Sequence, residues 1–323
     1  LKNTGGMACV IAILGVFVPV LGCGAIYYFF FIDSFSFENI IRTAFVGVVF
    51  AATSVSITVE ALNEMGKLKT KVGATILNAA IIDDIIGIVV LSVVMGVADS
   101  SVNPLLTVGK IVLFFIFAGA VGFIIYKIFK KISVNHGKSR RIAVWALAFC
   151  FVMSFLAEYV FGVADITGAY VSGVILCNLT KSRQFLAKKM TVASYVLFSP
   201  VFFANIGLKT DLSGFTSKIA IFAVLLVIMS IVTKIAGCGL AAKICGLKSR
   251  ESLTVGIGMV ARGEVALMIA QKGIDAGYID KAIFPAIVLC VIVAALTTPI
   301  MLKLSYKGVK DEENSLTAEE NAR

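Results

Sequence analysis

Long apolar runs, separated by short polar or glycine- and proline-containing segments, fill most of the chain. Because a bilayer crossing needs about 20 apolar residues, such runs are typical of transmembrane helices. The separations predict about ten helices, at 6–32, 41–61, 72–97, 105–129, 142–162, 165–179, 191–208, 219–242, 252–271 and 281–303. The pattern therefore predicts an all-α polytopic membrane protein, which ends in a polar, disordered tail at 305–323.

The composition points the same way. Of the 323 residues 59% are hydrophobic and only 15% are charged, whereas soluble domains carry about 25% charged residues. The net charge of +10 is compatible with nucleic-acid binding, but in a polytopic membrane protein an excess of Lys and Arg is typical of cytoplasmic loops. The length leaves no room for a separate catalytic domain. We therefore expect a protein that is not an enzyme and has no nucleic-acid partner.

The distribution of basic residues predicts the orientation. If successive loops alternate between the two sides, 21 of the 29 Lys and Arg residues fall on one side and six on the other. The remaining two, Lys234 and Arg262, lie within predicted helices. Since basic loops stay in the cytoplasm, both ends of the chain are expected there, in a multi-pass plasma-membrane protein surrounded by the lipid bilayer.

Asp83 and Asp84 are the most unusual charges of the chain, because they lie among isoleucines inside an apolar run. Asp83 is eleven residues into the helix at 72–97, hence about 17 Å deep in a core of about 30 Å. Two adjacent carboxylates cannot both remain ionised there without cations. A carboxylate at such a depth can exchange a proton for a hard cation. The alternative is a pair that serves folding alone.

Lys234 is the expected partner of these aspartates. It lies eight residues from the end of the helix at 219–242, about 12 Å deep, where a long side chain can bridge to an acidic pair. The alternative is that the side chain extends to the membrane interface instead.

Two further segments interrupt apolar runs. Glycines at 256, 258 and 263 surround Arg262 and Glu264, and they weaken a helix that can break only where protein or water meets its free backbone groups. The two charges are expected to neutralise each other or the exposed helix ends, in a structural pair or with a direct role in transport. A cluster of small hydroxyl residues at 51–58 occupies the matching place in the helix at 41–61.

The helices between 6 and 97 and those between 219 and 303 form two triplets, each with a polar interruption in its middle helix. The first triplet begins inside and the second outside, so the two have opposite topology. Thr53 precedes Asp83 by 30 residues, and Arg262 precedes Val291 by 29. Secondary transporters built from inverted repeats cross two broken helices at the membrane centre, beside the ion site. The pattern predicts an ion-coupled carrier.

Five segments together resemble bacterial sodium/proton antiporters of the monovalent cation:proton antiporter superfamily. They are Thr53-Ser-Val-Ser-Ile-Thr58, Asn78 to Gly87 with its Asp pair, Ser199-Pro-Val-Phe-Phe-Ala-Asn-Ile-Gly207, Lys234, and Gly258-Met-Val-Ala-Arg-Gly-Glu264. The similarity extends from about residue 1 to 304. One departure is Ala261, where many relatives have proline.

The resemblance implies a protomer of thirteen helices in a homodimer, with the first three helices missing before Leu1. It implies core triplets at 1–98 and 211–304, a linker helix at 99–131 and dimerisation-domain helices at 132–210.

The resemblance also implies the roles of the candidate site residues. Asp84 would bind the cation and the proton, with Asp83 as the second carboxylate for Na+ and as the partner of Lys234. The remaining candidates are Thr53 and Ser54 at the first crossing, Arg262 and Glu264 as charge compensation at the second, and Asn78 in support.

The expected activity is exchange of cytoplasmic Na+ or Li+ for external H+. An Asp pair is associated in this family with electrogenic exchange, and no cofactor is expected besides the transported ions. Three alternatives are weighed against it: a K+/H+ efflux antiporter of the same fold, an intramembrane aspartyl protease and a sodium-coupled organic-anion symporter. The protease would need aspartates on two helices, and the symporter would not need Lys234 beside two aspartates.

Overall fold

A computed structural model describes residues 5–98, 104–136, 140–163, 165–179, 182–210 and 216–306. All regular elements in these ranges are helices, which confirms the all-α prediction. The chain divides into two compact units, one made of residues 1–87 and 211–323 and the other of residues 88–210. The division falls within the long helix at 71–98, and the predicted boundaries at residues 98, 131 and 210 stay predictions. The predicted tail lies, from residue 307 on, outside the described residues.

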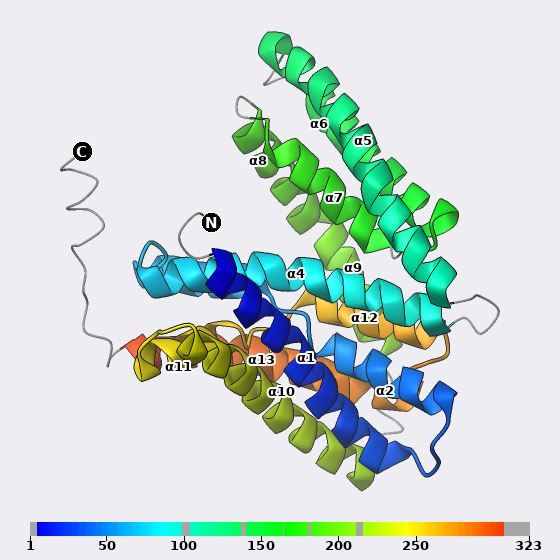
Figure 1. The fold of residues 1–323 in the computed structure, drawn as a ribbon, viewed down its shortest axis with the longest axis vertical. Coiled ribbons are helices and arrows are strands. Elements are labelled where there is room, and N and C mark those ends of the chain that lie inside the picture. The colour runs from blue at the N-terminus through cyan, green and yellow to red at the C-terminus, as the bar shows by residue number, and fades with distance from the viewer. Residues whose placement is uncertain are drawn as a thin grey trace. The chain divides into compact units, whose positions relative to one another are not determined.

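The first unit contains the candidate site. Its helices are α1 (Gly5–Phe31), α2 (Phe37–Val49), α3 (Val55–Glu64), the first part of α4 (Lys71–Ala98), α10 (Ser217–Ile244), α11 (Ser249–Gly258), α12 (Glu264–Asp275), the short η3 (Lys281–Ile283) and α13 (Phe284–Tyr306). In Figure 1, α1 lies along α10, although more than 200 residues separate their starts. Helices from the two ends of the sequence therefore form one core.

Glycines allow the helices of this core to approach closely. A Cβ atom on Gly237 of α10 would lie 2.7 Å from the carbonyl oxygen of Leu14 in α1, and one on Gly256 of α11 would lie 2.7 Å from that of Ile235 in α10. Small residues at such positions let helix backbones pack together in a membrane, where the hydrophobic effect does not drive helices together. The turn between α10 and α11 depends on Gly246, whose φ of 92° is unfavourable for other residues.

The second unit consists of the rest of α4, α5 (Pro104–His136), α6 (Arg140–Phe155), the π-helical η1 (Leu156–Val160), α7 (Asp165–Cys177), α8 (Arg183–Ala193), the π-helical η2 (Ser194–Phe198) and α9 (Ser199–Lys209). Within it α6 packs against α7, and α5 contacts both. Its role as a dimerisation domain stays a prediction.

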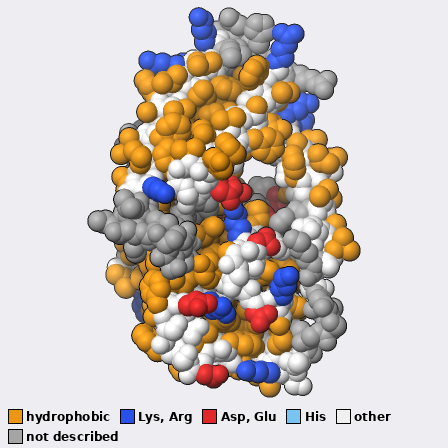
Figure 2. All heavy atoms as spheres, turned by 90° about the vertical axis from the view of Figure 1, so that its right-hand side faces the viewer, with side chains coloured by type: hydrophobic (Ala, Val, Ile, Leu, Met, Phe, Trp, Pro, Cys, Tyr) orange, Lys and Arg blue, Asp and Glu red, His pale blue; other side chains and the backbone are white. Residues whose placement is uncertain are grey.

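Length and surface fit a membrane protein. Six of the described helices are long and apolar enough to cross a bilayer: α1, α4, α5, α10, α13, and α6 together with η1. Large apolar side chains such as Phe29, Ile124 and Leu296 are exposed, and hydrophobic side chains cover much of the face in Figure 2. Each of the ten predicted ranges coincides with one or more helices. The number of crossings stays a prediction.

Candidate functional site

The two interrupted helices meet at their interruptions. The helix predicted at 41–61 is split into α2 and α3 around residues 50–54, and the one predicted at 252–271 is split into α11 and α12 around residues 259–263. The backbone N–H of Ser54 donates to the carbonyl oxygen of Ala261 at 2.7 Å. The hydroxyl of Thr58 donates to the carbonyl oxygen of Gly258 at 2.8 Å. The crossing of two broken helices expected from the sequence is thus present.

The glycines of the second interruption do not provide a left-handed turn. Gly256, Gly258 and Gly263 are absent from the described residues with positive φ, so none of them provides a left-handed turn. They make room instead. A Cβ atom on Gly258 would lie 2.7 Å from Cδ1 of Ile76, and one on Gly263 would lie 2.9 Å from Oγ of Ser54. These two glycines let the second interruption lie directly against α4 and the first interruption.

Asp83 and Lys234 form a fully buried ion pair, with both side chains 0% exposed. The Lys234 ammonium donates to both carboxylate oxygens of Asp83, at 2.9 and 3.1 Å. It also donates to the carbonyl oxygens of Gly15 at 2.7 Å and Ala51 at 2.8 Å. Thr53 donates its hydroxyl to Asp83 Oδ2 at 2.8 Å. The lysine therefore does not extend to the membrane interface, and the charge of Asp83 is neutralised where it lies.

Arg262 is also 0% exposed, and it binds backbone oxygens. Its guanidinium donates to the carbonyl oxygens of Ala52 at 2.7 Å and, at 3.5 Å, of Ala51 and Ser230. Among the described ion pairs there is none between Arg262 and Glu264. Of the two possibilities left open by the sequence, this geometry favours the second, because Ala51 and Ala52 directly follow the end of α2.

The buried charges balance one another around the ends of α2 and α11. Each C-terminal end carries about half a negative charge, because its last carbonyl groups have no partner within the helix. Together with the carboxylate of Asp83, these ends offset the two positive charges of Lys234 and Arg262.

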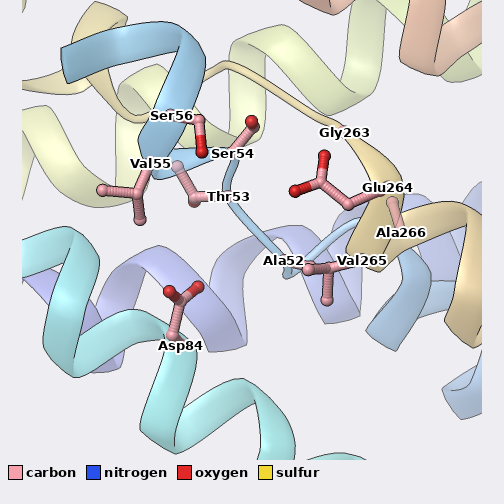
Figure 3. A pocket seen from close by; sticks show the side chains of 10 residues that line it. All are labelled: Ala52, Thr53, Ser54, Val55, Ser56, Asp84, Gly263, Glu264, Val265 and Ala266. Carbon is pink, nitrogen blue, oxygen red and sulfur yellow. The ribbon is translucent and has the colours of Figure 1, made fainter. Parts of the chain in front are cut away.

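A small polar pocket of about 90 Å³ lies at the crossing. Asp84 lines it, whereas Asp83 does not. The other lining residues belong to the interruptions and to the first turns of α3 and α12: Ala52, Thr53, Ser54, Val55, Ser56, Gly263, Glu264, Val265 and Ala266. Figure 3 shows the carboxylates of Asp84 and Glu264 directed toward this space from different helices. The adjacent aspartates thus face different surroundings.

Ser54 contributes an oxygen that has no partner. It is the N-cap residue of α3, yet its side chain makes no capping hydrogen bond. The residue is only 6% exposed, and its buried Oγ has no hydrogen-bond partner in the described part of the chain. A buried hydroxyl without a partner is costly. A ligand in the pocket would relieve this cost.

The structure also defines the positions of the remaining candidates. Asn78 lies half-buried on α4 and is not among the residues that line the pocket. The carbonyl groups of Gly15, Ala51 and Ser230, which hold the buried cations, were not found from the sequence. Backbone oxygens carry no sequence signal of their own, so no residue type could have revealed them.

Comparison with known proteins places this arrangement in a family. The model of the family described as "Sodium/hydrogen exchanger, transmembrane" matches residues 1–304. The chain belongs to the transmembrane sodium/hydrogen exchanger family. It is therefore a multi-pass membrane transporter of the antiporter type.

Relatives within the sodium/hydrogen exchanger family include two well-matched bacterial proteins. The Na(+)/H(+)-K(+) antiporter GerN of Bacillus cereus is 35% identical over 272 residues, which cover 84% of this chain and 69% of GerN. The Na(+)/H(+) antiporter of Enterococcus hirae is 33% identical over 304 residues, which cover 91% of this chain and 78% of that protein.

A solved structure shares the fold. The sodium proton antiporter MjNhaP1 of Methanocaldococcus jannaschii matches with a TM-score of 0.70 and 19% identity, over 95% of this chain and 78% of that one. At this identity the match supports the exchanger fold alone.

Proposed function

We propose that this exchanger moves Na+ out of the cytoplasm in return for external H+, and that Asp84 is the carboxylate that takes either ion. The observation that carries this proposal is the contrast between the two aspartates. Asp83 is fully buried and paired with Lys234, whereas Asp84 is half-buried and lines the polar pocket. Of these two aspartates, Asp84 is therefore the one with both an unpaired carboxylate and a space for a cation beside it.

The chemistry of the pocket suits a small hard cation. Such ions prefer oxygen ligands, and the lining offers the carboxylates of Asp84 and Glu264 and the hydroxyl groups of Thr53, Ser54 and Ser56. A volume of about 90 Å³ has room for an ion that keeps some of its water. Na+ is the transported substrate here, and the proposal needs no resident cofactor.

Competition for one carboxylate couples the two ions. A proton on Asp84 removes the negative charge that attracts Na+, and a bound Na+ disfavours protonation of the same group. If the pocket opens to one side of the membrane at a time, each opening lets one ion replace the other. We infer that the unit that contains the crossing moves against the other unit during exchange. We also infer that the protein is a homodimer and that both ends of the given chain lie in the cytoplasm.

Asp83 and Lys234 provide a route to a second proton. Thr53 lines the pocket and donates its hydroxyl to Asp83. A cation bound to the hydroxyl oxygen of Thr53 is therefore close to Asp83 and can compete with Lys234 for its carboxylate. If Asp83 turns toward the cation, Lys234 loses its carboxylate partner, and its ammonium group can then give up the second proton. Exchange of more than one proton per Na+ would then be electrogenic.

The decisive test is the substitution Asp84→Asn in the full-length protein. Everted vesicles are acidified by respiration, and proton efflux is followed after addition of Na+, Li+ or K+ in separate runs. We expect efflux with Na+ for the wild type and none for Asp84→Asn, because the amide cannot exchange a proton. Asp33→Asn, which removes an exposed carboxylate outside the pocket, serves as the control. Undiminished exchange by Asp84→Asn would refute the assignment.

The K+ run addresses the selectivity. The name of the relative GerN includes K+ as well as Na+, so the same fold is compatible with both ions. If K+ alone causes proton efflux, the transported cation is K+ and not Na+, and the proposed role of Asp84 stays the same.

A further inference from the structure

The position of Glu264 lets its side chain do more than balance the partial positive charge at the start of α12. It is the first residue of α12, follows the buried Arg262 by two positions, and is exposed. Arg262 is engaged by backbone oxygens instead. The carboxylate of Glu264 is thus available on the wall of the pocket that Asp84 lines, and Figure 3 shows it directed into that space.

The groups that line the pocket have a net negative charge. The first turns of α3 and α12 both line it, and each N-terminal end carries about half a positive charge. These two ends together offset one of the two carboxylates, Asp84 and Glu264. With both acids ionised, a net charge of about −1 remains, which equals the charge that one monovalent cation neutralises.

Ser54 provides independent support for a ligand at this place. Its unbonded, buried Oγ lies 2.9 Å from where a Cβ atom on Gly263 would be, so it faces the start of α12, next to Glu264. Because this hydroxyl oxygen has no hydrogen-bond partner, it is suited to complete the coordination of a cation.

We propose that Glu264 is a second cation ligand of the exchanger, the first that an incoming Na+ meets, and that it holds the ion together with Ser54 before and during its contact with Asp84. This inference rests on the proposed function and adds a residue to its site. The exposed Glu264 attracts the cation from water, and the half-buried Asp84 exchanges it for a proton. Glu264 contributes to Na+ affinity, while Asp84 is required for turnover.

The test measures Na+-dependent proton exchange by the full-length protein in proteoliposomes over a range of Na+ concentrations. Glu264→Gln keeps the size of the side chain and removes its charge. We expect the KM for Na+ to rise about tenfold, the effect of losing one contact to a charged group, while kcat changes by less than about twofold. Glu264→Asp keeps the charge and should recover part of the affinity.

Asp275→Asn is the matched control, because it removes an exposed acid from the same helix, α12, away from the pocket. It should leave KM unchanged. If Glu264 only compensates the helix end, Glu264→Gln would lower the thermal stability with no change in KM, and that result would overturn the inference. Should Glu264→Gln fail to fold, an unchanged KM in Glu264→Asp would overturn it equally, since the shorter side chain moves the carboxylate away.

Failure of the inference and failure of the proposed function are distinguishable. If the wild type exchanges Na+, Asp84→Asn is inactive and Glu264→Gln has a normal KM, only the role of Glu264 is wrong. If Asp84→Asn still exchanges Na+, the proposed function is wrong whatever Glu264 does.

Discussion

Replacing Lys234 by methionine should destabilise the protein strongly, because it leaves the carboxylate of Asp83 without its counter-ion. Both side chains are 0% exposed, and the three N–H groups of the ammonium are shared among four acceptor oxygens at 2.7 to 3.1 Å. Removal of one partner from a buried ion pair costs about 3–5 kcal/mol. We expect Lys234→Met to lower the free energy of unfolding by that amount.

The double variant Asp83→Asn/Lys234→Met separates the stranded charge from the other losses. It removes the charge but leaves the carbonyl groups of Gly15 and Ala51 without their donor, which costs about 1–3 kcal/mol. The double variant should therefore be more stable than Lys234→Met by about 2 kcal/mol.

The assay is denaturation of the purified protein in mixed micelles with increasing amounts of SDS, followed by circular dichroism. Lys243→Met, which removes an exposed lysine from the same helix, α10, is the control and should remain within about 0.5 kcal/mol of the wild type. A double variant no more stable than Lys234→Met would contradict the reasoning, since a stranded charge would then not be the cause.

Two further substitutions test the surroundings of this pair. Thr53→Val removes the hydroxyl that donates to Asp83 and should cost about 1.5–3 kcal/mol in the same assay, the usual contribution of a hydrogen bond to a charged group. Thr53→Ser keeps the hydroxyl and should be much milder. Gly15→Ala would place a Cβ atom 2.6 Å from Sγ of Cys238 and 3.2 Å from Oδ1 of Asp83, so we expect a loss of about 1–3 kcal/mol. Cys238→Ala should restore much of it, and a fully additive double variant would refute this packing explanation.

The helices could be predicted from the sequence because apolar runs of sufficient length have few other structures available in a membrane. The interruptions around residues 50–54 and 259–263 were also visible, since hydroxyl, glycine and charged residues break otherwise apolar runs. Their contact, from Ser54 to Ala261, could be expected only from the predicted opposite topology of the two triplets.

The site could be predicted in part. Asp83, Asp84 and Lys234 are detectable as charges at membrane depth. Neighbours on a helix point about 100° apart, so one aspartate can meet a partner while the other faces a cavity. Which aspartate does which came from the family resemblance. The sequence offered helix ends as one possible partner of Arg262, but it could not identify the residues, because the partners are backbone carbonyl groups, which every residue carries.

The most direct test of the central claim, that Na+ and H+ compete for Asp84, is the release of protons from the purified protein. Na+ is added to a weakly buffered solution of the protein in detergent, and the change in pH is recorded. We predict that the wild type releases protons and that the release saturates with Na+ concentration, whereas Asp84→Asn releases none. Proton release by Asp84→Asn equal to that of the wild type would contradict the claim.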